Sequence, residues 1–235
     1  MTKDNNAIIW QGESLIDGGP TVAIISGLTS PSKNGKTGPM AQVDIIRSDV
    51  HPYEAVKLGL DHSICGDCSF RGSQCYVNVV FGPGMKYKAM LNGNIPVMTP
   101  EQAGAMLKAK NIGCRTGAYG DPFAVPLEIW QRLHKAADTF STSYTHQWQR
   151  PDFDPGLFEY SMASVDPDNT VEQLQALYPT ARYYRVTKTY DDIDPSTEVR
   201  CPSKNDAGER VLQCADCKLC DGALKAKNVV ILEDE

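Results

Sequence analysis

Short apolar runs alternate with turn-rich polar stretches along the N-terminal part of the chain. The runs are AIIW (7–10), TVAIISGL (21–28) and AQVDIIRSD (41–49). Runs rich in Ile and Val that are bounded by Gly, Pro and Ser are typical of β-strands. The pattern predicts three strands of an N-terminal sheet, with TSPSKNGKTGP as a loop between the second and the third.

Apolar residues at helical spacing begin further along the chain. The segment 98–111 predicts a helix, because Thr99 can cap its N-terminus and Gln102 can complete a capping box. A second helix is predicted over about 126–140, where apolar side chains recur three and four positions apart. A third is predicted over 170–178, which opens with another Thr-x-x-Gln box.

Further strands are predicted between and after these helices. They cover 111–119, 141–146, 157–164 and 181–187, and NVVILED closes the chain. Strand and helix alternating at this spacing favour parallel strands joined by crossover helices. A complete eightfold (β/α) barrel takes about 250 residues, and this chain of 235 residues spends many of them in cysteine-rich loops. We therefore expect an α/β fold built as a partial or irregular (β/α) barrel.

The same pattern divides the chain into three parts. We expect an N-terminal β extension over 1–55 and a partial barrel that carries the first cysteines over 56–190. A cysteine-rich loop and the final strand would make up 191–235. The chain contains no internal repeat and no low-complexity region.

Composition and charge narrow the class of protein. Apolar residues make up 41% and charged residues 22%, as in ordinary globular domains. The apolar runs are too short to span a bilayer or to serve as a secretory signal, so we expect a cytoplasmic protein with no membrane partner. The net charge of −6 and the scattered basic residues disfavour a nucleic-acid partner.

Four cysteines lie within twenty residues near the C-terminus: Cys201, Cys214, Cys217 and Cys220. In a reducing cytosol such a group indicates metal binding or catalysis rather than disulfides. Four thiolates can complete a tetrahedral zinc site or hold a four-iron cluster. The compact C-x-x-C-x-x-C run, with a fourth cysteine at a distance, favours an iron–sulfur cluster of the 4Fe-4S type, and zinc is the alternative.

Three more cysteines, Cys65, Cys68 and Cys75, form an upstream group. Three thiolates around a four-iron cluster leave one iron without a protein ligand, open to a small molecule. Alternatively, a fourth ligand comes from elsewhere in the chain, and the candidates are Cys114, His62 and Cys201. A further alternative is that the clustered cysteines build one site and leave the remainder inert.

Several motifs carry a resemblance to known families. CGDC…CY, RTGAYGDP, YTHQW, MASVD and CP…CADCKLCDG resemble those of a family of uncharacterised proteins carried by phages and plasmids, over about residues 60–225. The order of a three-cysteine group, a partial barrel and a second cysteine group is distantly similar to radical S-adenosylmethionine proteins with an auxiliary iron–sulfur cluster. That resemblance implies S-adenosylmethionine as a co-ligand, although the spacing here is C-x2-C-x6-C rather than C-x3-C-x2-C.

Polar side chains are expected at the carboxyl ends of the predicted strands, the face that carries the chemistry of (β/α) barrels. They are Arg115, Tyr119, Asp121, His146, Trp148, Asp166, Arg185 and Lys188. We interpret Tyr119, Asp121 and His146 as candidate catalytic residues and the other five as candidate ligand-binding residues. An acid, an imidazole and several cations near a metal would suit a small anionic or phosphorylated ligand.

Each assignment has a structural alternative. GAYGDP can be only a turn in which Asp121 caps the next helix, and His146 can be a hydrogen-bonded structural histidine. Trp148 can lie in the core or in a lid, and Asp166 can cap a turn. The sequence therefore predicts an iron–sulfur protein that acts at an open-iron cluster. The alternative is a non-enzymatic, metal-stabilised binding or redox-sensing module.

Overall fold

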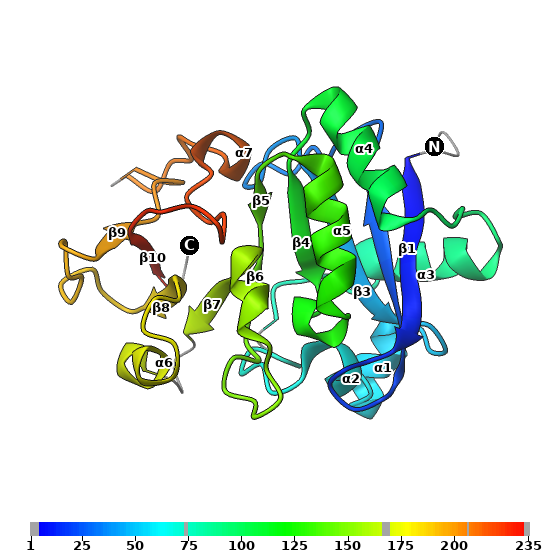
Figure 1. The fold of residues 1–235 in the computed structure, drawn as a ribbon, viewed down its shortest axis with the longest axis horizontal. Coiled ribbons are helices and arrows are strands. Elements are labelled where there is room, and N and C mark those ends of the chain that lie inside the picture. Colours follow the sequence, from blue (N-terminus) through cyan, green and yellow to red (C-terminus); the bar gives the residue numbers. More distant parts are fainter. Residues whose placement is uncertain (1–4, 73–74, 166–169, 206, 233–235) are drawn as a thin grey trace.

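The computed structural model describes residues 5–72, 75–165, 170–205 and 207–232. Its strands form two five-stranded sheets (Figure 1). The first sheet has the order β1 (Asn6–Glu13), β2 (Pro20–Ser26), β3 (Ala41–Arg47), β4 (Cys114–Tyr119) and β5 (Ser141–Thr142). β2 pairs antiparallel with both β1 and β3, whereas β3–β4 and β4–β5 are parallel.

The second sheet is parallel at each of its four pairings. Its order is β6 (Tyr144–Thr145), β7 (Met162–Val165), β8 (Tyr183–Thr187), β10 (Asn228–Leu232) and β9 (Glu198–Arg200). Ser143 alone separates β5 from β6, so the edge of one sheet leads directly into the edge of the other. This mixed architecture confirms the α/β part of the prediction and the cysteine-rich C-terminal region.

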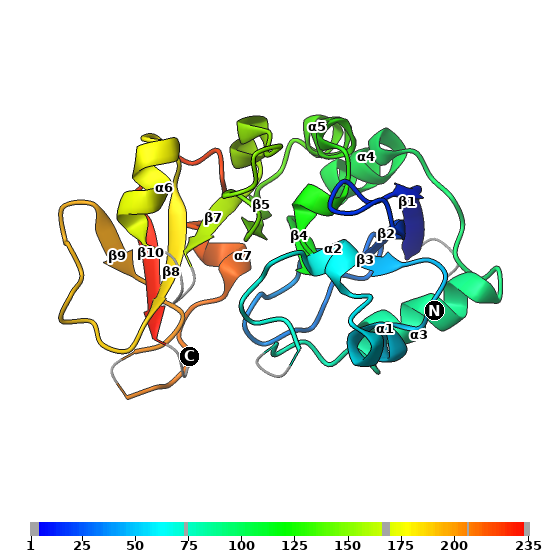
Figure 2. The ribbon, with the colours of Figure 1, turned by 90° about the horizontal axis from the view of Figure 1, so that it is seen from below.

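Helices cover both faces of the first sheet. α4 (Pro100–Lys110) and α5 (Leu127–Ala137) lie on one face, and α1 (Pro52–Leu58), α2 (His62–Cys65) and α3 (Gly82–Leu91) lie on the other (Figures 1 and 2). α6 (Val171–Leu177) packs on β7, and the short α7 (Cys214–Cys217) lies between the two sheets (Figure 2). Two 3₁₀ turns, η1 (Pro122–Ala124) and η2 (Pro155–Glu159), complete the described elements.

The main apolar core follows from these layers. β2 and β3 are buried almost from end to end because helices cover both faces of their sheet, which explains their continuous apolar runs. Trp130 of α5 is fully buried, and its indole N–H donates to Pro122 O at 2.9 Å. A second, much smaller apolar cluster contains the buried residues Met162, Cys220 and Val229, so one cysteine group has far less apolar support than the other.

Three sequence predictions need correction. Residues 157–159 belong to the 3₁₀ turn η2, because Pro155 starts a turn that Asp154 caps through Gly156 N (2.8 Å), and the strand begins only at Met162. The strand predicted over 141–146 is split into β5 and β6. β1, β2 and β3 are joined to β4 in one sheet rather than forming an appended extension.

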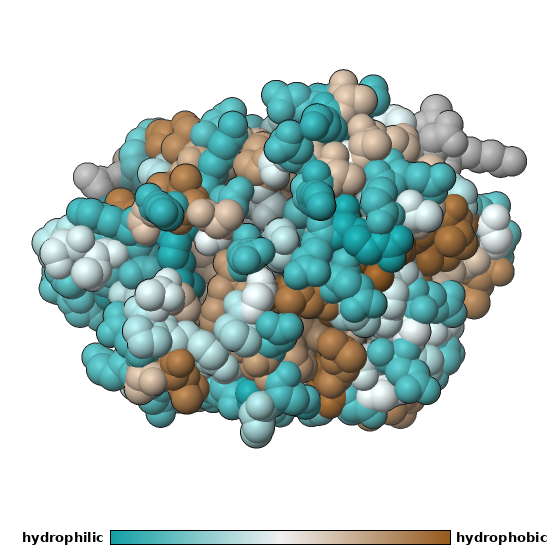
Figure 3. Space-filling view, viewed as in Figure 1, coloured by the Kyte–Doolittle hydropathy of each residue, from teal (hydrophilic) through white to brown (hydrophobic). Residues whose placement is uncertain are grey.

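The surface is mainly hydrophilic on the face shown in Figure 3, where apolar residues form separate patches. In the described part of the chain, the helices lack the combination of length and apolar character that a membrane span requires.

Candidate metal centres

The first cysteine group lies where α2 ends. Cys65 is the last residue of α2, and Cys68 and Cys75 follow on the way to α3. Burial raises the pKa of the Cys65 and Cys75 thiols, and the nearby Cys68 thiol adds to the effect. The three thiols are therefore within electrostatic reach of one another, and metal binding here would have to displace their protons.

Two polar contacts fix the loop that carries these thiols. Gln147 donates from Nε2 to Cys65 O at 2.9 Å, and its Oε1 accepts from Asp67 N at 3.4 Å. Gly66 has φ +53°, and an added Cβ would lie 2.1 Å from Gln147 Oε1, so only glycine fits beneath this amide. Sequence reasoning missed Gln147, although it lies inside the YTHQW motif.

The three predicted catalytic residues surround this group. Asp121 is buried and accepts from Phe123 N (3.0 Å), Thr145 Oγ1 (2.8 Å) and His146 N (2.7 Å). Burial raises the pKa of Asp121, and the neighbouring His146 opposes that shift. The structure thus brings Asp121 and His146 together, and His146 also interacts electrostatically with Cys75.

Tyr119 stands out because its buried hydroxyl has no hydrogen-bond partner. Burial raises the pKa of this phenol, and the thiols of Cys65 and Cys75 contribute. A buried hydroxyl without a partner is costly, by about 1–3 kcal/mol. The donor is therefore available to a group held among the three thiols.

A buried ion pair lies beside Tyr119. Asp44 is opposite Tyr119 in the register of β3 and β4, and its Oδ2 lies 2.5 Å from Lys86 Nζ of α3. Both side chains are largely buried. Sequence reasoning missed this pair; the available signal was a single acid inside the apolar run AQVDIIRSD.

The proposed fourth ligands lie in different places, and His62 is the first residue of α2, the helix that ends at Cys65. Cys114 is buried in the main core at the start of β4, whereas Tyr119 is at its end. His62 faces two acids, with 3.5 Å from Nδ1 to Asp17 Oδ2 and 3.6 Å from Nε2 to Asp67 Oδ1. Cys201 belongs to the second group. Cys114 and Cys201 therefore lie away from the first group, whereas His62 lies near it and faces two carboxylates.

The second group surrounds a small cavity. Cys201, Cys214, Cys217 and Cys220 all line a space of about 20 Å³, which is enough for one water-sized particle. Ser203 also lines it, and its buried Oγ has no partner. As the side chains stand, no three or more His, Cys, Asp or Glu residues in the described ranges are arranged to hold a metal ion. The donor types, the shared cavity and the unpartnered hydroxyl nevertheless fit a metal–thiolate centre.

Arg182 shapes the backbone around Cys220. Its guanidinium donates to Leu219 O (2.8 Å), Asp221 O (2.6 Å), Lys227 O (2.7 Å) and Ala226 O (3.1 Å). A single half-buried cation thus satisfies four carbonyls of an irregular segment, which apolar packing could not do. On the other side, burial raises the pKa of Cys220 to about 12, and the hydroxyl of Tyr144 opposes this by a hydrogen bond to the thiol.

Arg115 lies between the two cysteine groups. Its Nη2 donates to the hydroxyl of Tyr76, the residue after Cys75, and its charge interacts with Cys214 of the second group. Arg115 is the second residue of β4, so it lies at the start of the strand and not at the carboxyl end where it was predicted. Its charge acts on Cys214 of the second group, and its contact near the first group is with Tyr76.

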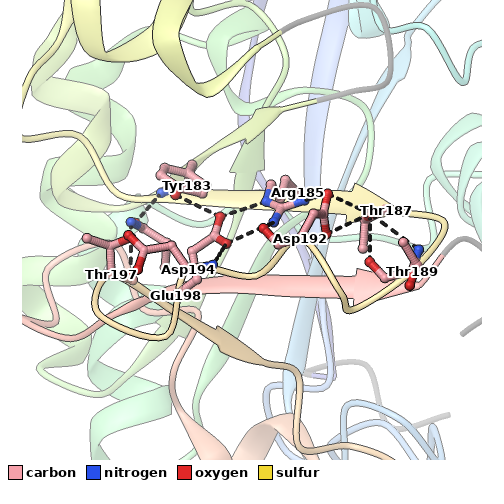
Figure 4. A network of polar contacts seen from close by, with 9 residues as sticks. Tyr183, Arg185, Thr187, Thr189, Asp192, Asp194, Thr197 and Glu198 are labelled. Carbon is pink, nitrogen blue, oxygen red and sulfur yellow. Dashed lines mark hydrogen bonds and ion pairs between the residues drawn. The ribbon is translucent and has the colours of Figure 1, made fainter.

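The remaining predicted ligand-binding residues have structural partners or lie outside the groups. Trp148 is fully buried and donates from Nε1 to Ser164 O at 2.8 Å, so it is part of the core. Arg185 is held by Glu198, with Nε–Oε1 at 2.6 Å and Nη2–Oε2 at 2.8 Å, and by Asp192 (Figure 4). Lys188 is exposed just beyond β8, and Asp166 lies outside the described residues.

Comparisons with family models, curated proteins and solved structures found no match for this chain. The functional assignment consequently depends on the residues described above and on their chemistry.

Proposed function

We propose that the protein is an iron–sulfur protein whose first cysteine group, Cys65, Cys68 and Cys75, holds a cluster with one open iron. The main support is the grouping of these three thiols with the unpartnered hydroxyl of Tyr119 and the Asp121–His146 pair. Three thiolates leave one iron of a four-iron cluster able to bind a small molecule and to act as a Lewis acid or electron donor.

The course of the parallel strands supports this function. β3, β4 and β5 are parallel neighbours in the first sheet, and β6, β7, β8 and β10 are parallel neighbours in the second. β5 and β6 are not paired with each other but follow one another along the chain. We interpret this wall as a partial, irregular (β/α) barrel. The ends of β4 and β6 would then open on the face where such folds carry their chemistry.

The chain's own residues have defined roles in this proposal. Tyr119 donates a hydrogen bond to the bound ligand, and His146 accepts or donates a proton beside Cys75. Asp121 fixes the backbone of His146, and Arg115 attracts an anionic ligand. S-adenosylmethionine is the co-ligand that the family resemblance implies, and it is the first ligand to test.

Metal analysis tests the proposal. Anaerobically prepared protein should be brown and carry iron and acid-labile sulfide in equal amounts. Adding S-adenosylmethionine should change the electron paramagnetic spectrum of the reduced wild-type cluster, and Cys68→Ser should abolish that change while Cys114→Ser keeps it. Colourless protein with stoichiometric zinc, or an iron whose fourth ligand is a protein side chain, would refute the open-iron assignment.

A second function is favoured by the second group. Its four thiols line a cavity of single-ion size, and Arg182 holds the backbone around them. These features suit a closed structural centre, of zinc or of iron and sulfide, in a non-enzymatic binding or redox-sensing module. Metal bound at the second group but absent from the first would establish this alternative.

A further inference from the structure

The second cysteine group is docked on a loop from the far N-terminal part of the chain. Cys214 N donates to Lys36 O at 3.1 Å, Ala215 N donates to Thr37 O at 2.9 Å, and Gln213 Nε2 donates to Gly35 O at 3.1 Å. These contacts join α7 to the loop between β2 and β3, across 178 residues of sequence. The loop predicted from TSPSKNGKTGP is therefore a docking element.

Contacts within the docking loop hold its shape. Asn34 Oδ1 accepts from Lys36 N (2.8 Å) and Thr37 N (3.1 Å), and Asn34 O accepts from Gly38 N (2.9 Å). Gly38 has φ +75°, and an added Cβ would lie 2.8 Å from Gln213 Oε1. The loop therefore presents its carbonyls to α7 in a fixed geometry that requires glycine at 38.

The side chain of Lys36 adds charge to this geometry. Lys36 is half-buried, and its ammonium interacts electrostatically with the thiols of Cys201 and Cys214. Lys33, in the same loop, is exposed. Thiolates that ligate a metal are anions, so they attract the positive charge that Lys36 places near Cys201 and Cys214.

We propose that Lys36 is a positioning residue of the four-cysteine centre, so that metal binding by these thiolates and docking of residues 34–38 stabilise each other. The inference depends on the part of the proposed function that places a metal at the second group. It adds to that function a link between the N-terminal sheet and the C-terminal segment that depends on metal, and we call this link the clamp. Groups that support metal ligands from outside commonly change metal affinity by about 10–100-fold when removed.

Hydrogen exchange against buffered free Zn²⁺ tests the clamp in the full chain purified without metal. Exchange of the peptide covering 211–222 reports the second group alone, so the first group does not confuse the result. We expect its amides, with those of 34–38, to become protected together as zinc rises. Lys36→Gln should shift the midpoint to about tenfold higher free zinc, and the control Lys33→Gln should leave it unchanged.

A second pair of variants separates docking from charge. Gly38→Ala should raise the zinc midpoint because the added methyl group pushes Gln213 away, whereas Gly35→Ala, which meets no atom within 4 Å, should not. Equal midpoints for Lys36→Gln and Lys33→Gln would overturn the role of Lys36 while leaving the metal centre intact. Zinc-independent exchange of 211–222, unaltered by Cys217→Ser, would overturn both the inference and a metal at the second group.

Discussion

The two cysteine groups are supported in opposite ways. Cys65 packs against the main apolar core, and the first group sits among buried polar side chains whose contacts are local to the ends of β3, β4 and β6. Among the described residues, the apolar cluster that contains Cys220 of the second group has few fully buried members, Met162 and Val229 besides Cys220. The backbone of the second group is held instead by Arg182 and by the docking loop. The first region can fold around apolar surface, whereas the second needs something else to stabilise it.

The difference bears on the roles proposed for the two groups. A metal at the second group would supply folding free energy that the small apolar cluster does not. Around the first group, the unpartnered hydroxyl of Tyr119 and the pair Asp44–Lys86 are features that stability alone does not require. Buried polar groups of this kind are more typical of ligand sites than of structural supports.

The largest predicted effect concerns loss of a ligand at the second group. Cys217→Ala should lower the free energy of unfolding by more than about 4 kcal/mol, because a structural metal would be lost together with its folding free energy. Cys114→Ala, which removes a buried thiol from the main core, should cost only about 1 kcal/mol. Thermal and urea unfolding of both variants, prepared anaerobically, measures the difference.

Solubility provides a second readout for the same pair. The Cys217→Ala protein should expose the segment around α7 and become less soluble, whereas the Cys114→Ala protein should not. Equal unfolding curves for the two variants would show that the thiol of Cys217 contributes no more to stability than the thiol of Cys114. A stabilising metal at the second group would then be refuted.

Acid should act on the main core through His134. Burial lowers the pKa of this histidine from 6.5 to about 4, and its ring stacks on Tyr160 with its Nε2 3.2 Å from Thr116 Oγ1. Because the folded pKa lies below the unfolded one, protons favour the unfolded chain, and stability falls as the pH drops from about 6.5 to about 4. The loss should approach about 3 kcal/mol.

The His134→Gln variant removes this titration. Its free energy of unfolding should change less between pH 7 and pH 4 than that of the wild type, even if it is lower at pH 7. Measuring both proteins after chelation of metal keeps acid release of metal from the second group out of the result. Identical pH dependence in the two proteins would mean that acid does not act through the main core.

Structure that depends on residues close together in the sequence was predicted correctly, whereas contacts between distant segments were not predicted. The capping boxes at Thr99 and Thr170 are both present, because such boxes involve residues only three apart. α3 was missed because Gly82, Pro83 and Gly84 at its start resemble a loop. Before the fold was known, nothing in the sequence could pair Lys36 with Cys214, since their contact depends on how two distant segments pack.

The site predictions divide in the same way. Tyr119, Asp121 and His146 lie near the first group, and their proximity could be expected because polar residues at strand ends share an edge, which is a property of topology. Arg185 was expected to face a ligand, but its guanidinium is held by Glu198, thirteen residues away across a loop. A sequence shows that a cation is present; whether an acid already neutralises it depends on the packing of neighbouring strands.

The smallest predicted effect compares the two unpartnered hydroxyls directly. Tyr119→Phe and Ser203→Ala should each leave the metal-free protein as stable as before, or more stable by up to about 1 kcal/mol, because each removes a buried donor without a partner. In the metal-loaded protein each substitution should instead weaken metal binding at its own cysteine group.

Tyr183→Phe is the matched control: the hydroxyl of Tyr183 donates to Glu198 Oε1 at 2.8 Å, so its removal should destabilise both the metal-free and the metal-loaded protein. Urea unfolding with and without metal checks the change of sign. If Tyr119→Phe destabilises the metal-free chain as Tyr183→Phe does, its hydroxyl already has a partner in the folded protein, and the first group loses one of its main supports as a ligand site.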